Sequence, residues 1–143
     1  LFQWLTDRGI LIGLFAFTPV PGTALESRPP PSLAVYRRLQ VARLLIVEGH
    51  IHARDLTFDR DGRILGYGFD KGELCALLAD GRAFQTAGCP GCNRPYYNER
   101  PGDTLYNYPR PLTPREVEEA LDCITIEEED CLYDHLSRRP PLR

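Results

Sequence analysis

The sequence predicts an α/β fold in which parallel strands are covered by helices, and three observations lead to this prediction. The 143 residues are enough for one domain with a core of its own. Helical and strand-like stretches alternate along residues 1–88, which is typical of a parallel sheet. Residues 10–17 are apolar without alternation, as expected for a strand that is buried on both faces.

The first half of the chain supplies a helix, a strand and a second helix. Residues 1–9 resemble the last turns of an amphipathic helix that ends at Gly9. The apolar strand at 10–17 follows and ends in a turn rich in proline and glycine. Ser32 is a suitable N-cap for a core-facing helix that ends at Gly49. We expect the arginines of this helix to lie on its solvated face: Arg37, Arg38 and Arg43.

The middle of the chain continues the alternation. Residues 55–59 alternate like a strand, an Asp-Gly turn follows, and residues 64–68 resume an extended pattern. Residues 71–80 read as a short helix, in which we expect Cys75 to be a core residue. Residues 84–86 read as the next strand.

The tail, residues 113–143, has a different character and is predicted to be helical. Thr113, Pro114 and Glu116 form a capping box with proline at the first helical position. A similar signal at Thr125 predicts a second short, acidic helix.

Composition excludes several classes of protein. Hydrophobic residues make up 43% and charged residues 26%, which are ordinary globular values. The net charge of −3 provides no positive electrostatic field that would attract nucleic acid, so we expect no nucleic-acid partner. No apolar run approaches the ~20 residues of a membrane span, and no signal peptide is visible. We therefore expect no membrane partner, a cytoplasmic location and reduced thiols for the five cysteines.

The start of the chain suggests a piece of a longer protein. The sequence contains no Met, and it opens inside a helical pattern rather than before one. We therefore expect further sequence upstream.

A long loop at 89–112 carries the strongest chemical signal. Two residues separate Cys89 from Cys92, so both sulfurs can turn toward one metal ion or close a disulfide. The surrounding Gly, Pro, Tyr, Asn and Arg residues favour a functional loop over a plain connector. A cluster or metal site, a structural zinc site and a reduced pair that stabilises a turn are all compatible with this pattern.

Three stretches resemble the radical SAM enzymes of the biotin synthase and lipoyl synthase branch. Residues 14–26 resemble the strand of that branch that ends in a Pro-x-Pro-Gly-Thr turn. Residues 36–46 resemble the helix that follows, and residues 81–88 its last barrel strand. The resemblance covers roughly residues 1–100, and the loop resembles most closely that of two-component lipoyl synthases.

The resemblance implies that residues 1–88 form the C-terminal half of a (βα) barrel. It implies a [4Fe–4S] cluster that cleaves S-adenosylmethionine to a radical, and an auxiliary cluster that supplies sulfur to an unactivated carbon. Cys89 and Cys92 would hold the auxiliary cluster, while Pro19, Gly22 and Thr23 would lie near S-adenosylmethionine. The substrate would be a small molecule or a protein-bound acyl group.

The chain also departs from this family. The Cys-x3-Cys-x2-Cys motif that holds the SAM-cleaving cluster is absent, so a partner radical SAM subunit or upstream sequence would have to supply it. A cluster usually takes four protein ligands, and Cys75, Cys123, Cys131, upstream residues or a substrate are candidates for the others.

Two other functions remain open. The first is a non-catalytic module in which Cys89 and Cys92 hold zinc or a cluster and the loop binds a partner. The second is a thiol redox pair, which needs its cysteines at a helix start, whereas the Pro and Gly residues here favour a loop.

Overall fold

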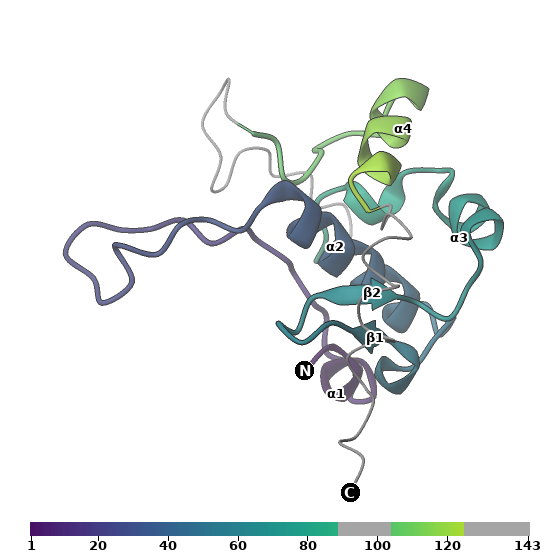
Figure 1. Cartoon of the computed structure of the whole chain (residues 1–143), viewed down its shortest axis with the longest axis horizontal. Coiled ribbons are helices and arrows are strands. Elements are labelled where there is room, and N and C mark those ends of the chain that lie inside the picture. Colours follow the sequence, from purple (N-terminus) through teal and green to yellow (C-terminus); the bar gives the residue numbers. More distant parts are fainter. Residues whose placement is uncertain (89–103, 125–143) are drawn as a thin grey trace, which may run out of the picture.

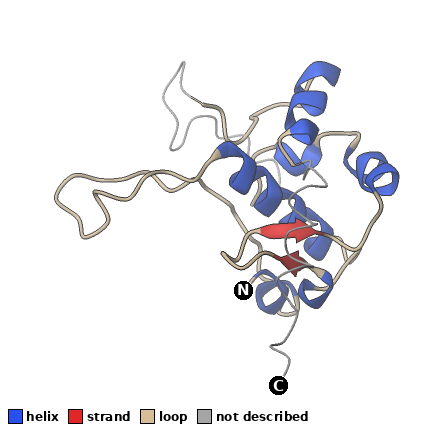
Figure 2. Ribbon diagram, viewed as in Figure 1, coloured by secondary structure: helices blue, strands red, loops and turns tan. Residues whose placement is uncertain are grey.

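A computed structural model describes residues 1–88 and 104–124 (Figures 1 and 2). In chain order its elements are α1 (Phe2–Thr6), α2 (Leu33–Val47), the 3₁₀ helix η1 (Ala53–Asp55), β1 (Thr57–Phe58), β2 (Ile64–Gly66), α3 (Lys71–Leu78), the 3₁₀ helix η2 (Arg82–Phe84) and α4 (Pro114–Asp122). Cys89, Cys92, Cys131 and the second helix predicted in the tail lie outside the described residues.

The predicted half of a parallel (βα) barrel is wrong. The sheet in the described part has two strands, β1 and β2, which pair antiparallel with Thr57 opposite Gly66 and Phe58 opposite Ile64. A tight turn joins them, in which Gly62 has a φ of +79°. Two strands joined by so short a turn can pair only in the antiparallel sense. The strand-like pattern at 55–68 therefore builds a small hairpin, seen in red in Figure 2.

The strand expected at 10–17 does not form. Residues 10–20 have no regular secondary structure, and their alternate residues Ile12 and Ala16 are buried while Leu11 is 67% exposed. Side chains of α2 bind the carbonyl groups here: Arg43 Nε donates to Ile12 O at 2.9 Å. One apolar face therefore packs on the body and the other faces solvent, because the segment leans on a helix instead of joining a sheet.

The strand expected at 84–86 is also wrong. Residues 82–84 form η2, which begins after Gly81 in the left-handed region at a φ of +70°. Beyond η2, Gln85 makes a single parallel bridge to Tyr108. The apolar signal at Phe84 reflects burial in the core rather than membership of a sheet, since its side chain is fully buried.

The predicted beginnings of two helices are confirmed. Ser32 Oγ accepts a hydrogen bond from the Val35 amide at the start of α2. Thr113 and Glu116 form the predicted capping box of α4, with Pro114 at the first helical position. The predicted helix at 71–80 is present as α3, capped by a box of Asp70 and Glu73. Side-chain oxygens satisfy free amides in each case, which is why local sequence locates these helix starts.

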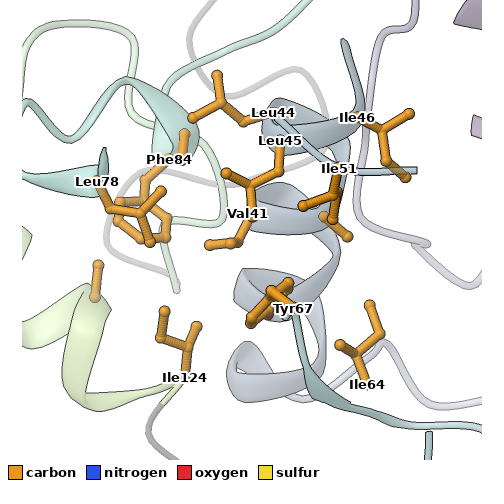
Figure 3. Packing of buried hydrophobic residues seen from close by; sticks show 13 residues of the cluster. Val41, Leu44, Leu45, Ile46, Ile51, Ile64, Tyr67, Leu78, Phe84 and Ile124 are labelled. Carbon is orange, nitrogen blue, oxygen red and sulfur yellow. The ribbon is translucent and has the colours of Figure 1, made fainter. Parts of the chain in front are cut away.

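Helix α2 runs through the core (Figure 3). Val41 and Leu45 on this helix have no exposed surface, and they pack among apolar side chains from the hairpin, α3, η2 and the end of α4. The buried members of this cluster are Val41, Ala42, Leu44, Leu45, Ile46, Ile51, Ile64, Tyr67, Leu78, Ala83, Phe84, Ala120 and Ile124. In the described residues, no helix combines the length and apolar character that crossing a bilayer requires.

Candidate functional site: the base of the cysteine loop

The two chain segments that flank residues 89–103 are held side by side. The Tyr108 amide donates to Phe84 O and the Thr86 amide donates to Tyr108 O, each at 2.9 Å. The bridge between Gln85 and Tyr108 lies at the same place. The segment that carries both cysteines of the Cys-x-x-Cys motif therefore leaves and re-enters the body at one fixed point, which we call the loop base (residues 84–88 and 104–108).

Arg37 of α2 binds the returning side of the loop base. Its guanidinium donates to Leu105 O at 2.9 Å, to Tyr106 O, and to Gln40 Oε1 at 2.7 Å. Only 2% of Arg37 is exposed, so the expectation of a solvated arginine is wrong here. A buried guanidinium keeps its charge by donating to several oxygens, and these carbonyls provide them.

Gln40 and Asn107 extend the same network. The Gln40 amide nitrogen donates to Tyr106 O and to Asn107 Oδ1, both at 3.0 Å. Asn107 in turn donates to the Tyr36 hydroxyl at 2.9 Å, and that hydroxyl donates to Leu14 O at 2.9 Å. The network thus connects α2, the loop base and the segment at 10–20. We call Tyr36, Arg37, Gln40 and Asn107 the polar clamp.

Two aromatic rings flank the guanidinium of the clamp. Arg37 Cζ lies 5.4 Å from the ring centre of Phe84 and 5.2 Å from that of Tyr108, one ring from each side of the loop base. Both distances allow cation–π attraction. Burial raises the pKa of the Tyr108 hydroxyl above its usual value, while the charge of Arg37 acts in the opposite direction. Tyr108 therefore stays neutral and serves as a packing surface.

The last described residue before Cys89 lies against the segment at 10–20. Gly88 has a φ of +132°, and a Cβ built on it would lie 3.5 Å from Gly13 Cα. Gly13 is equally close, because its own Cβ would lie 3.5 Å from Ala87 O. The positive φ of Gly88 is what favours glycine there, since Cβ atoms at 3.5 Å would make ordinary van der Waals contacts.

Two of the other predicted ligands, Cys75 and Cys123, lie in the described part. Cys75 is a partly buried residue of α3, and Cys123 follows the last turn of α4; both are free thiols. Within residues 1–88 and 104–124, no three His, Cys, Asp or Glu side chains form a group that could hold a metal ion. Cys89 and Cys92 lie outside these ranges, so a metal site that includes them stays a prediction.

The turn predicted to lie near S-adenosylmethionine is placed in the long loop between α1 and α2. Figure 1 shows this loop extending away from the helices. At the turn itself, the Thr23 hydroxyl donates to Val20 O at 2.7 Å, and the Gly22 amide donates to Glu26 at 2.6 Å. Pro19 is half-buried, while Gly22 and Thr23 are exposed. The described contacts do not bring this turn to the loop base.

Comparisons with protein-family models, with curated proteins and with solved structures find no match. The radical SAM resemblance therefore rests on the sequence motifs alone.

Sequence reasoning missed the polar clamp, although part of its signal was present. Arg37 and Gln40 fall at helical spacing with the buried residues Val41 and Leu44, so they share the core-facing side of α2. A polar pair inside an apolar stripe indicates a buried network. Asn107, its distant partner, gives no comparable local signal.

Proposed function

We propose that Cys89 and Cys92 supply two thiolate ligands to an iron–sulfur cluster, and that the chain is the auxiliary-cluster part of a radical SAM enzyme that inserts sulfur. The resemblance at residues 14–26 and at the cysteine loop supports the enzyme class. The observation that carries the proposal is the clamped loop base, with hydrogen bonds of 2.9 Å between residues 84–86 and Tyr108.

The clamp favours ligand binding for an entropic reason. Bringing two ends of a flexible segment together costs conformational freedom, and so does ordering ligands around a metal. Here the two ends are already hydrogen-bonded to each other. Arg37 and Gln40 also bind the carbonyl groups of residues 105 and 106 on the C-terminal side of the loop base. The cost of bringing the two ends together would then not fall on binding. A cluster bound there would supply sulfur or electrons, while the chain's own residues would fix the loop that holds it.

The proposal requires a partner for the radical chemistry. No Cys-x3-Cys-x2-Cys motif occurs in the sequence, so the site that cleaves S-adenosylmethionine would belong to another subunit or to upstream sequence. A small molecule or a protein-bound acyl group would be the substrate. Pro19, Gly22 and Thr23 would contribute to cofactor binding only when such a partner covers their exposed turn.

A second candidate is a non-catalytic binding module with zinc or a cluster at the same cysteines. The fold favours it, since the described part is a helical core with a two-stranded antiparallel hairpin rather than part of a barrel. Small folds often use a structural metal to complete a core.

Metal analysis of the anaerobically reconstituted chain separates the candidates. Iron and acid-labile sulfide that disappear in the Cys89→Ala, Cys92→Ala variant would support the cluster. The Cys75→Ala, Cys123→Ala variant also removes two thiols, and retention of the metal by this variant would show that neither is among the remaining ligands. Zinc without sulfide would favour the binding module. Retention of metal by the Cys89→Ala, Cys92→Ala variant would contradict both candidate functions. The absence of metal from the native chain would also contradict both.

A further inference from the structure

A groove with a volume of about 690 Å³ lies between α3 and α4. Figure 1 shows both helices at the same end of the molecule, away from the long loop between α1 and α2. Lys71 and Cys75 of α3 and its C-cap residue Ala79 line the groove; they are four apart and so lie on one side of the helix. This side of α3 therefore faces the groove along its whole length.

The opposite wall is a continuous side of α4. Pro114, Val117 and Leu121 line it at helical spacing, and Leu112 adds apolar surface before the helix begins. Two helices with an apolar strip between them form the kind of channel that accepts a third helix.

The charges at this groove are mainly negative. Asp80, Glu118 and Asp122 line it, against one cation, Lys71. Asp80 is neutralised by Arg82, whose Nε lies 2.8 Å from its carboxylate. In the part of the chain that the structure describes, the side chains of Glu118 and Asp122 make no hydrogen bond or ion pair.

The other acidic residues of α4 differ from these two. Glu116 is bound by Arg110 at 2.7 Å and Glu119 by Arg115 at 2.9 Å, and neither lines the groove. Among the described residues, the carboxylates of α4 that lack a cationic partner are therefore the ones beside the apolar strip. This arrangement complements a ligand that is apolar on one side and positively charged at its edge.

We propose that the groove between α3 and α4 binds a basic amphipathic helix of a partner protein. Apolar side chains of that helix would enter the strip formed by Leu112, Val117 and Leu121. Its Lys or Arg residues would pair with Glu118 and Asp122, which would set the orientation of the bound helix.

The test uses a short fluorescent peptide of leucine and lysine in an amphipathic helical pattern, with a leucine–glutamate peptide as comparator. Fluorescence anisotropy should show that the lysine peptide binds the chain saturably and that the glutamate peptide does not. The Glu118→Gln, Asp122→Asn variant should bind it about fivefold more weakly, because two partly exposed charge pairs are lost. The matched control is Asp61→Asn, Glu119→Gln, which removes the same charge outside the groove and should leave the affinity unchanged.

The thiol of Cys75 gives an independent readout, since it lines the groove. Saturating lysine peptide should slow alkylation of Cys75 several-fold, followed by mass spectrometry with Cys123 as internal reference. Equal weakening by the two double variants would reveal unspecific charge attraction and overturn the proposal. Unchanged alkylation of Cys75 would also overturn it. So would a dimer of the native chain that the Glu118→Gln, Asp122→Asn variant dissociates, since the groove would then belong to a second copy.

Discussion

Arg37 is the residue on which the polar clamp depends. Its guanidinium joins α2 to two carbonyl groups of the loop base and stands between the rings of Phe84 and Tyr108. Removing it takes the guanidinium donor from Leu105 O, while Tyr106 O keeps its hydrogen bond from Gln40. A lost charge-assisted bond costs more than a neutral one.

We therefore expect Arg37→Met to lower the free energy of unfolding by about 2–4 kcal/mol, as measured by urea denaturation. Methionine keeps much of the apolar volume, so the loss would report the hydrogen bonds. The exposed Arg63 is the control, and Arg63→Met should change the free energy by less than about 0.5 kcal/mol. Equal effects at the two positions would contradict the clamp.

Glu116 makes the stability of α4 depend on pH. Hydrogen bonds from the Arg110 side chain, and then from the Thr113 amide, lower the pKa of its carboxyl from 4.5 to about 2. The folded chain thus keeps the carboxylate charged at pH values where the unfolded chain binds a proton. The stabilisation is complete above pH 4.5 and is lost as the pH falls toward 2.

Acid titration of helicity by circular dichroism tests this expectation. Native chain should lose stability relative to Glu116→Gln as the pH falls through that range, because glutamine does not titrate. A constant difference between the two proteins from neutral pH down to pH 2 would contradict it.

At the level of elements, Gly81 allows η2 and α4 to pack together. A Cβ on Gly81 would lie 2.9 Å from Val117 Cγ2 and 3.2 Å from Leu112 Cβ, and its φ of +70° already disfavours other residues. Gly62 in the hairpin turn has a similar φ of +79° but open space around it. Comparing alanine substitutions at Gly62 and Gly81 therefore separates the cost of backbone strain from the cost of steric conflict.

We expect Gly62→Ala to destabilise the fold by about 1 kcal/mol through its backbone alone. Gly81→Ala should cost about 1–3 kcal/mol more, because Val117 and Leu112 must move. Thermal unfolding of both variants gives the comparison. A similar loss for the two would mean that α4 can shift away from η2 without cost.

The elements also show how far local sequence can predict this fold. Ser32 and Thr113 mark helix starts correctly because a cap acts on amides within the next few residues. The hairpin at 55–68 is likewise a local structure, which the Asp-Gly turn indicates. The strand predicted at residues 10–17 is wrong because an apolar run indicates burial only, whereas a strand also needs a neighbouring strand with which to pair. The polar clamp combines α2 with Asn107, which no local pattern connects.

At the level of the whole molecule, the loop between α1 and α2 exposes much apolar surface. No charged residue occurs from Ile10 to Leu25, and within this stretch Leu11 is 67% and Val20 55% exposed. Exposed apolar surface of this extent promotes association.

We expect the isolated chain to self-associate at high concentration, and Leu11→Gln, Val20→Gln to reduce this without lowering the melting temperature. Sedimentation velocity across a concentration series would measure the effect. Val47→Gln, which changes an exposed valine at the end of α2, should leave association unchanged. Association that persists in the first variant would show that another surface is responsible.

The pairing of residues 84–86 with Tyr108 has a consequence for the integrity of the molecule. Because these segments are bonded to each other and α4 is anchored in the core through Ala120, we expect the fold to survive the loss of the covalent link through residues 89–103. A protease that cuts once within that stretch should therefore yield two pieces that stay together under native conditions and separate only in denaturant. By the same reasoning, new chain termini could be placed there without dismantling the core.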